Sequence, residues 1–582
     1  MNNDELISQA QNYLKAEDHP IFKKEIEELL ASQNFSELNE RFYTSLSFGT
    51  GGLRGVIGGG TNRMNPYMVR SATQGLATYV NSVVGKGGIA VIAHDNRNYS
   101  DLFALEAALT LCANGIKTYL FPALRPTPLL SFAVRQLKAT TGIMVTASHN
   151  PAEYNGYKVY WNDGAQVLPP HDQGIIEQVK AVKGQFKTLS KAEALAKRLL
   201  IYLDESLDGT YSDMVQAQSL RPNLLKEKGS GLKVVYTSLH GTGATLLPKL
   251  MKNMGVDLIN VQEQSVFDGN FPTVTSPNPE EASAMKMALE LAAQKKADLI
   301  IGTDPDADRI GIGVPHKGEY VLLNGNQLGS LLTEYAFSTL KALGRMPDRP
   351  AFLNTIVTTD LQTLIARAYG AQTYKTLTGF KYIGEKIREF EADPQGPQYV
   401  IGGEESYGFL FGTAVRDKDA ISAAALTIEM ALHYQSQGKT IMEGLEEIYL
   451  KYGYFKEILI SKTFKGQAGV HKMKSFMEGI RTSPPKNIGS LKIEALLDYL
   501  TLKKTFLDSN KVEQIVDIAV SDVVQFQMDD GSLISVRPSG TEPKIKFYAS
   551  CRGPEGVELK KAESMVELKL KEINQVLDQW IN

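Results

Sequence analysis

Short apolar runs alternate with polar, glycine-containing loops over most of the chain. Apolar residues at helical spacing between positions 21 and 30 predict that residues 1–45 are helical. Beyond them, each expected strand leads into a polar loop and then into a helix. The expected strands are GIAVIA (88–93), IKTYLF (116–121), GIMVT (142–146), LKVVYT (232–237), DLIIG (298–302), FLNTIVTT (352–359) and QYVIGG (398–403). Strands that alternate with helices predict an α/β protein with mixed, mostly parallel sheets covered on both faces.

The last part of the chain has a different pattern, in which one strand follows another. Strands are expected at KEILISKTF (456–464), VDIAVSDVVQFQM (516–528) and KIKFYAS (544–550), with a hairpin turn at 529–531 and a final amphipathic helix. This predicts a smaller C-terminal α+β domain. At roughly 150 residues per domain, 582 residues give about four domains. We place them at residues 1–205, 206–320, 321–450 and 451–582.

Composition narrows the class of protein. Lys plus Arg total 62 and Asp plus Glu total 65, a formal net charge of −3, which does not suggest a nucleic-acid binder. Cys112 and Cys551 are the only cysteines, too few for a disulfide framework or a cysteine-rich metal site. The N-terminal residues lack the apolar segment of a secretory signal, and the most apolar helical stretch, 420–432, is too short to span a bilayer. We expect a soluble, cytoplasmic enzyme acting on a small molecule, with no membrane partner; the oligomeric state is not readable.

The sequence DPDADR (304–309) follows the expected strand DLIIG directly. Three carboxylates at alternate positions, Asp304, Asp306 and Asp308, can converge on one hard divalent cation. An EF-hand is excluded because its sixth and twelfth positions, a Gly and a Glu, are here Arg309 and Pro315. A solvated acidic turn is the alternative. The position at the carboxyl end of an expected central strand, where α/β sheets bind ligands, favours a metal site.

The sequence TASHNP (146–151) follows the strand GIMVT in the same way. Ser148 could be a nucleophile, although the GxSxG pattern of serine hydrolases is absent. Because His149 is adjacent to Ser148 in sequence, we expect a proton relay between them to be awkward. A helix-capping serine beside a structural histidine is an equal alternative. Downstream, YNGYK (154–158) is expected to form a turn that could return Lys158 to the same cleft.

Two further loops suit a phosphorylated polyol. The sequence GGEESYG (402–408) offers two carboxylates and a hydroxyl, which suit sugar hydroxyl groups, but the same letters could form an ordinary helix N-terminus. The sequence RPSGTEPK (537–544) offers an arginine fork, two hydroxyl donors and a glycine that lets backbone N–H groups approach an oxyanion. A Pro/Gly surface turn is the alternative there.

Taken together, these motifs resemble the α-D-phosphohexomutase superfamily, and within it the phosphoglucomutase/phosphopentomutase subgroup. The likeness runs from about residue 48 to the C-terminal helix and also includes FGTGGLRG (48–55). It implies four domains around a central cleft, three of them related α/β units and the last a smaller α+β domain. It implies the conversion of glucose 1-phosphate into glucose 6-phosphate, by a phosphoserine and a glucose 1,6-bisphosphate intermediate that also serves as activator.

The resemblance also implies residue roles. Ser148 would carry a phosphoryl group, and the three aspartates would hold Mg²⁺ together with an oxygen of phosphoserine. Lys158 and Lys418 are the candidates for general acid/base work, and a cleft crowded with cations should lower the pKa of such a lysine. Arg54, His149 and Arg309 match positions near the transferring group. Residues expected to bind the substrate are Thr378, Gly379, Lys381, Glu404, Ser406, Arg537, Ser539, Gly540 and Thr541.

Three other activities stay open at this stage. A phosphopentomutase acting on ribose or deoxyribose phosphates is the nearest, because the sugar loop favours a glucose phosphate but alone does not exclude a pentose. Another phosphohexomutase is a further alternative. A metal-dependent serine phosphatase would also use a serine nucleophile and carboxylate-bound metal. A non-catalytic sugar-phosphate sensor is disfavoured, because Ser148 and all three aspartates are present.

Overall fold

We describe the protein from a computed structural model, which covers residues 2–49, 51–464, 466–538 and 544–581. The chain forms two compact units. The first holds Met1–Asn324, Phe380–Gly396 and Ser406–Gln437, and the second holds Gly325–Gly379, Pro397–Glu405 and Gly438–Asn582. Among the described residues, no helix is both long enough and apolar enough to cross a membrane.

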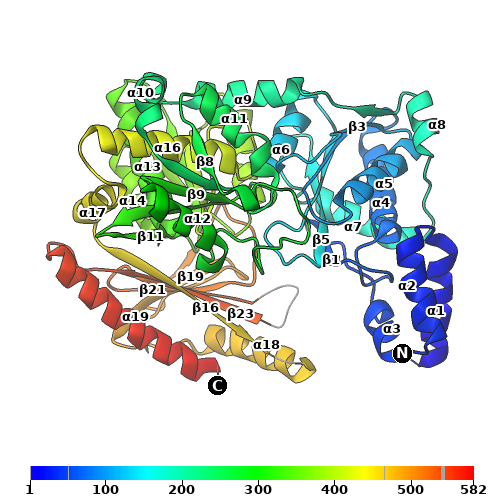
Figure 1. Cartoon of the computed structure of the whole chain (residues 1–582). Coiled ribbons are helices and arrows are strands. Elements are labelled where there is room, and N and C mark those ends of the chain that lie inside the picture. The colour runs from blue at the N-terminus through cyan, green and yellow to red at the C-terminus, as the bar shows by residue number, and fades with distance from the viewer. Residues whose placement is uncertain (1, 50, 465, 539–543, 582) are drawn as a thin grey trace. The chain divides into compact units, whose positions relative to one another are not determined.

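The chain begins with three helices, as predicted (Figure 1, dark blue). They are α1 (Asn3–Ala16), α2 (Pro20–Ala31) and α3 (Phe35–Phe42). Their apolar faces meet around the buried side chains Leu6, Tyr13 and Ile26. Amphipathic helices of this length are stabilised chiefly by such packing.

The first sheet of unit 1 has the strand order β1-β5-β4-β2-β3-β6. Its strands are β1 (Gly52–Val56), β2 (Ile89–His94), β3 (Lys117–Leu120), β4 (Thr141–Val145), β5 (Tyr154–Trp161) and β6 (Leu200–Tyr202). Its helices are α4 (Pro66–Val84), α5 (Ser100–Ala113), α6 (Thr127–Gln136), α7 (His171–Val182) and α8 (Lys191–Ala196). Strands β4, β2, β3 and β6 run parallel, whereas β5 pairs antiparallel with β1 and β4. The expected turn at 154–158 is therefore wrong: those residues begin β5.

The second sheet of unit 1 has the order β11-β10-β9-β7-β8. Its strands are β7 (Val234–Thr237), β8 (Leu258–Asn260), β9 (Leu299–Thr303), β10 (Ile310–His316) and β11 (Glu319–Leu323). The helices of this region are α9 (Ser206–Gln218), α10 (Pro222–Lys228), α11 (Leu247–Asn253) and α12 (Ala282–Lys295). Unit 1 also contains three elements from later in the chain: the helices α15 (Phe380–Ala392) and α16 (Ala420–Ser436) and the strand β15 (Gly408–Phe411). Strand β9 leads into its antiparallel neighbour β10. We expected a helix after the DPDADR loop; a strand follows instead.

The second unit contains a parallel arrangement in the order β13-β12-β14. Its elements are α13 (Gly325–Ala342), β12 (Pro350–Thr355), α14 (Asp360–Ala368), β13 (Gln372–Thr376), β14 (Gln398–Glu404) and α17 (Ile441–Tyr452). The strand expected at 352–359 ends at Thr355, and residues 356–359 form the turn into α14. Thr359 caps that helix, because its side chain accepts a hydrogen bond from the N–H of Leu361.

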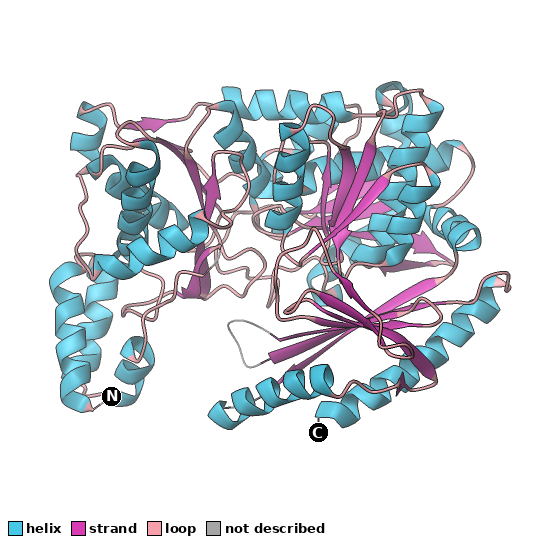
Figure 2. Ribbon diagram, turned by 180° about the vertical axis from the view of Figure 1, so that it is seen from behind, coloured by secondary structure: helices cyan, strands magenta, loops and turns pink. Residues whose placement is uncertain are grey.

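The C-terminal sheet is antiparallel, with the order β16-β23-β22-β21-β18-β19-β20. Its elements are β16 (Phe455–Thr463), α18 (Gly466–Thr482), β17 (Asn487–Ile488), β18 (Leu491–Asp498), β19 (Lys503–Phe506), β20 (Val512–Gln514), β21 (Val524–Met528), β22 (Leu533–Pro538), β23 (Lys544–Arg552) and α19 (Leu559–Ile581). Figure 2 shows helices beside these strands: α19 packs on β16 and β23, and α18 packs on β21. The predicted hairpin turn and final helix are confirmed. The strand expected at 516–528 shrinks to β21, and α18 and β17–β20 were not predicted.

Candidate functional site

The loop between β9 and β10 holds its three aspartates in a fixed arrangement. Asp304 Oδ1 accepts hydrogen bonds from the backbone N–H groups of Asp308 and Arg309, at 3.1 and 3.0 Å. Ala307 adopts a φ of 50°, in the left-handed region, where the chain turns back toward β10. Asp304, Asp306 and Asp308 are each at most 1% exposed. The first carboxylate therefore closes the loop that carries all three.

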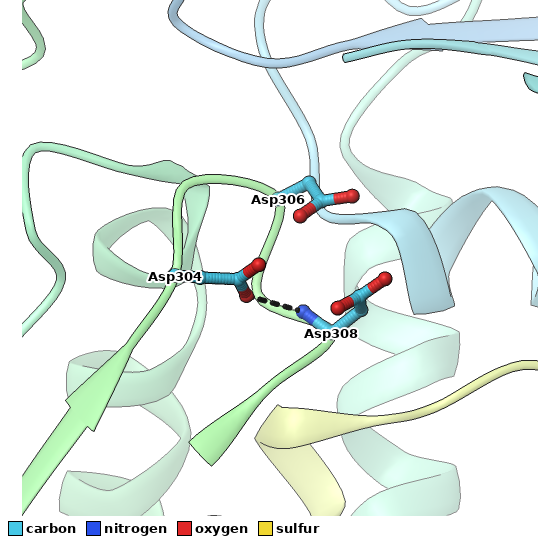
Figure 3. A group of neighbouring side chains, drawn as sticks. All are labelled: Asp304, Asp306 and Asp308. Carbon is cyan, nitrogen blue, oxygen red and sulfur yellow. Dashed lines mark hydrogen bonds between the residues drawn. The ribbon is translucent and has the colours of Figure 1, made fainter. Parts of the chain in front are cut away.

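The three carboxylates face a common space, as Figure 3 shows. One oxygen of each lies within 4.8 Å of the other two. Asp306 Oδ1 and Asp308 Oδ1 are buried and have no hydrogen-bond partner among the described residues. Buried carboxylate oxygens without partners are costly, and oxygen ligands of this kind suit a hard divalent cation. The residues therefore fit a metal ion.

Ser148 lies against these aspartates, just beyond the end of β4. Its Oγ donates a hydrogen bond to Asp304 Oδ2 at 2.7 Å, although the two residues are 156 positions apart. Its backbone N–H donates to Thr146 Oγ1 at 2.8 Å. Ser148 is buried and has a φ of 52°, which is uncommon for a residue other than glycine. The two strand-end loops thus bring the predicted nucleophile and the predicted metal ligands into direct contact.

His149 contacts the same hydroxyl, with its Nδ1 3.2 Å from Ser148 Oγ. Successive side chains point to opposite sides of an extended chain, but Ser148 is not extended, and the two side chains meet. The two side chains therefore lie within hydrogen-bond distance, but the Ser148 hydroxyl donates to Asp304, and a proton relay between Ser148 and His149 stays untested. Burial, together with the cations Arg309 and Arg54, lowers the pKa of His149 to about 2. Its imidazole is therefore neutral near pH 7 and is a weak proton acceptor at this position.

Arg97 binds the backbone of the loop that carries Ser148. This residue was not identified from the sequence. Its guanidinium donates hydrogen bonds to the carbonyl oxygens of Ser148 at 2.6 Å, Pro151 at 2.8 Å and Tyr154 at 3.0 Å, and also to that of Asn150. Its side chain is fully buried. One planar cation therefore fixes the backbone on both sides of Ser148. The sequence offered one indication of its role, namely its position in the polar loop DNR directly after the strand β2.

Two predicted lysines reach the aspartates. Lys158 Nζ, on β5, lies 2.8 Å from Asp306 Oδ2 and 3.4 Å from Asp308 Oδ2, and Lys418 Nζ lies 3.1 Å from Asp308 Oδ2. Thr127 Oγ1 also donates to Asp306 Oδ2, at 2.8 Å. Burial disfavours charge on these groups, but the cations outweigh it and lower the pKa of Asp308. The same carboxylates raise the pKa of Lys158, so the expected lowering is wrong for this lysine.

Asp417 forms an ion pair with Lys418. No role was assigned to this aspartate from the sequence either. Its Oδ1 lies 3.0 Å from Lys418 Nζ. Its Oδ2 accepts hydrogen bonds from Tyr160 OH at 2.7 Å and from Gln166 Nε2 at 2.9 Å. The backbone N–H of Lys418 also donates to Asp417 Oδ1, at 2.9 Å. The carboxylate thus fixes where Lys418 points.

The two predicted arginines border the site. Arg54 Nη1, on β1, donates to Asn150 Oδ1 at 3.3 Å. Arg309 Nη1 pairs with Glu280, and its Nε lies 3.9 Å from Asp308 Oδ1. Unit 1 thus contains one connected cluster, made of Ser148, His149, Lys158, Lys418, Arg54, Arg309 and the three aspartates.

The remaining predicted residues lie outside that cluster. In unit 2, the N–H of Gly379, next to Thr378, donates to Glu404 Oε1 at 2.8 Å. Arg537 lies near the end of β22. In unit 1, Ser406 precedes β15, and Lys381 lines a small cavity beside Trp161, its pKa lowered by burial. Ser539, Gly540 and Thr541 lie outside the described residues.

Glu405, next to Glu404, is held differently. Its carboxylate accepts hydrogen bonds from Thr355 Oγ1 at 3.2 Å and Thr358 Oγ1 at 3.1 Å. Burial and the neighbouring Glu404 carboxylate raise the pKa of Glu405 to about 7. The helix N-terminus considered for this loop is wrong, because the loop joins strands β14 and β15.

Models of one protein family match four successive parts of the chain. They are phosphoglucomutase/phosphomannomutase α/β/α domains I (45–185), II (210–318) and III (324–452) and the C-terminal domain (501–567). A phosphoglucomutase from Staphylococcus aureus is 39% identical over 526 residues, 90% of this chain and 92% of that protein. The chain belongs to the phosphoglucomutase/phosphomannomutase family.

Solved structures of this fold agree. Parafusin from Paramecium, an exocytosis-sensitive phosphoprotein and phosphoglucomutase crystallised in an open form, gives a TM-score of 0.68 at 18% identity, covering 92% of this chain and 96% of that one. A putative phosphomannomutase from Thermus thermophilus gives 0.66 at 22% identity, covering 91% and 99%. The predicted four-domain α/β fold with a C-terminal α+β domain is confirmed, and the protein is a mutase of this family.

Proposed function

We propose that the protein is a phosphoglucomutase that interconverts glucose 1-phosphate and glucose 6-phosphate. The observation that carries this proposal is the contact of Ser148 Oγ with Asp304, inside a buried triad of carboxylates that fits a metal ion. The curated relatives at 38–39% identity over about 90% of the chain bear the name phosphoglucomutase.

Ser148 is the proposed carrier of the phosphoryl group. The bond from phosphorus to Ser148 Oγ breaks as a bond forms from phosphorus to a free sugar hydroxyl, whose proton passes to a base. The product is glucose 1,6-bisphosphate. After this intermediate turns, the bond between its other phosphate and the sugar breaks, phosphorylated Ser148 is restored, and the sugar oxygen regains a proton.

The negative charge of the transferring group requires cations around Ser148. Asp304, Asp306 and Asp308 would hold Mg²⁺ together with a phosphoserine oxygen, and the ion would supply charge neutralisation at the transferring phosphoryl group. Arg54 and Arg309 are proposed to add positive charge at the border of the site. Their position beside the Ser148 loop and Asp308 supports this role.

Two groups are candidates for moving protons. His149 lies 3.2 Å from Ser148 Oγ and is proposed to position that atom, because its lowered pKa makes it a weak base. Lys158 and Lys418 are the candidates at the sugar oxygens. Lys158 must first lose the stabilisation that Asp306 and Asp308 give its charged form, and a metal ion that competes for those carboxylates would weaken it.

Substrate recognition is assigned to the loops that the family resemblance indicates. Glu404 and Ser406 would bind sugar hydroxyls, Thr378, Gly379 and Lys381 would line the same substrate, and Arg537, Ser539, Gly540 and Thr541 would hold the phosphate that does not react. The contact of Gly379 with Glu404 supports a shared site for two of these loops.

Two coarser assignments accompany this function. We propose domains at 1–205, carrying Ser148, 206–320, carrying the metal loop, 321–450, carrying the sugar loop, and 451–582, carrying the phosphate loop; the matched family segments support this division. A cytoplasmic location fits the two cysteines, both of which are unpaired and buried.

The test is a mutase assay on glucose 1-phosphate and ribose 1-phosphate with one preparation, primed with the matching bisphosphate. We expect the higher kcat/KM for glucose 1-phosphate, and a loss of about 10⁴-fold or more in Ser148→Ala. Ser436→Ala, at an exposed serine of α16, is the matched control. A preference for the pentose would make the protein a phosphopentomutase, and phosphate release without isomerised sugar would make it a phosphatase.

A further inference from the structure

Unit 2 contains a second cavity, lined by none of the residues assigned above. It has a volume of about 360 Å³ and lies between α14 and β13 on one side and the C-terminal sheet on the other. Gln525, on β21, spans this junction, because its Nε2 donates to the carbonyl of Ile356 at 2.8 Å. Cavities that bind small molecules have volumes of about 300 Å³ upward.

Cations outnumber carboxylates around this cavity. Arg367, Lys375 and Arg552 line it, against the single carboxylate of Asp360. Lys375 Nζ lies 2.8 Å from Asp360 Oδ1, so these two charges offset each other. Arg367 therefore remains without an acidic partner on the lining, whereas the charge of Arg552 is shared with Glu555, a glutamate outside it.

The two arginines differ in how far they are engaged. The only hydrogen bond of the Arg367 side chain to a described residue goes from its Nε to Thr373 Oγ1, at 3.0 Å, and its other nitrogens are available at the exposed mouth. Arg552 pairs with Glu555 at 2.5 Å, a glutamate that is 76% exposed, while its buried Nε has no hydrogen-bond partner among the described residues. Arginine forks at such positions suit a phosphate group.

The rest of the wall is apolar and aromatic. Phe455 and Tyr499 line the cavity, each about 4% exposed, and Leu364, Leu497 and Leu533 complete this part. The Arg552 guanidinium lies 5.7 Å from the centre of the Phe455 ring. Gln527 adds an amide able to bond a polar ring edge, whereas the amide of Gln525 is bound to Ile356, Ser535 and Tyr499. An anion without an apolar part, such as inorganic phosphate, would make no contact with this apolar wall.

We propose that the cavity binds a small phosphorylated molecule with a planar ring, of the mononucleotide class. The phosphate lies between Arg367 and Arg552, and the ring lies against Phe455, Tyr499 and the leucines. This site is separate from the Ser148 cluster, which belongs to unit 1. The ligand contacts both α14 and the C-terminal sheet, so it fixes the junction between them. The inference does not rest on the proposed mutase activity.

The experiment is calorimetric titration of the full-length protein with adenosine 5′-monophosphate, with adenosine and inorganic phosphate as separate probes. We expect saturable binding of the nucleotide and weaker binding of each part alone. Reversing one charge at the mouth, in Arg367→Glu, should weaken nucleotide binding about tenfold or more, whereas Arg367→Lys, which keeps the charge but loses the fork, should weaken it less than Arg367→Glu does. Arg345→Glu, at another exposed arginine of unit 2, should bind as the original does.

Two results would overturn the proposal. One is nucleotide binding that is absent or unchanged in Arg367→Glu while this variant keeps the thermal unfolding midpoint of the original protein. The other is inorganic phosphate that binds as tightly as the nucleotide, which would exclude recognition of the ring. Because the readout is binding at unit 2, it is independent of whether the mutase assay succeeds, and a second variant, Arg552→Gln, repeats the test from the other side of the cavity.

Discussion

Asp308 in unit 1 is buried, Glu405 in unit 2 is partly buried, and both follow a buried strand, yet their pKa values shift in opposite directions. Burial raises the pKa of each. Lys418 and Lys158 outweigh it at Asp308 and lower the pKa there. At Glu405 the neighbour is another carboxylate, Glu404, and the pKa rises to about 7.

The difference separates two kinds of carboxyl chemistry. Asp308 keeps its negative charge at any ordinary pH, as suits a group that contacts two lysines and is proposed to hold a metal ion. The pKa of Glu405 is raised to about 7, so its protonated form, which can donate as well as accept a hydrogen bond, is accessible near neutral pH. The identity of the nearest charges, rather than burial, decides which role a loop carboxyl can take.

The largest effect should come from removing the fixed charge. Asp308→Asn deprives two lysines and the expected metal ion of one carboxylate, and kcat/KM should fall about 10³-fold. Steady-state assays at saturating Mg²⁺ measure this. Asp213→Asn, at an exposed aspartate of α9, is the control. A loss of less than about tenfold would remove Asp308 from the reaction centre.

The next effect tests whether the geometry around the fixed charge matters as much as the charge. Arg97→Lys keeps the positive charge but loses the fork that holds the carbonyls of Ser148, Pro151 and Tyr154. We expect kcat to fall about 10²-fold with KM changed less, and the free energy of unfolding to drop by roughly 2–4 kcal/mol. Arg198→Lys, at an exposed arginine, should change neither quantity.

These two variants also mark the limit of sequence reasoning. The aspartate loop was predictable because three residues at fixed spacing carry both the ligands and their local geometry. Arg97 and Asp417 were not, because their roles arise from contacts 51 and 257 positions away in the chain. The sequence YNGYK was misread because Asn and Gly favour turns, whereas pairing with β1 and β4 makes these residues a strand.

A smaller effect on kcat is expected from changing Asp417, the carboxylate that pairs with Lys418. Asp417→Asn removes its ion pair and one acceptor of Tyr160 and Gln166, so Lys418 is held less firmly. We expect kcat to fall about tenfold with KM almost unchanged. Tyr160→Phe, which removes only one hydrogen bond, should lose less. Equal losses in both variants would contradict the positioning role, because they would place the effect in general packing.

The smallest effect belongs to Glu405. Glu405→Gln should raise KM for the sugar phosphate by about threefold, because glutamine reproduces only part of the hydrogen bonding. Its raised pKa means that the folded state binds the proton more tightly than the unfolded chain, so its stabilisation is complete below pH 4.5 and lost as pH rises to about 7. In Glu405→Gln, the free energy of unfolding measured with denaturant should depend less on pH between 4.5 and about 7.

Glu457 provides the matched control for this last variant. Burial raises its pKa to about 7 as well. Glu457→Gln should therefore flatten the same pH window while leaving KM unchanged. If it raised KM as much as Glu405→Gln does, the substrate-binding role of the loop at 402–408 would be contradicted.

The central claim is that Ser148 carries the phosphoryl group during turnover. Protein treated with glucose 1,6-bisphosphate should carry one phosphoryl group, located at Ser148 by peptide mass spectrometry. A rapid-quench mixture with excess glucose 1-phosphate should then lose that group from Ser148 and recover it at rates no slower than kcat. An unmodified Ser148, or a phosphoryl group that leaves more slowly than the sugar is isomerised, would contradict the account.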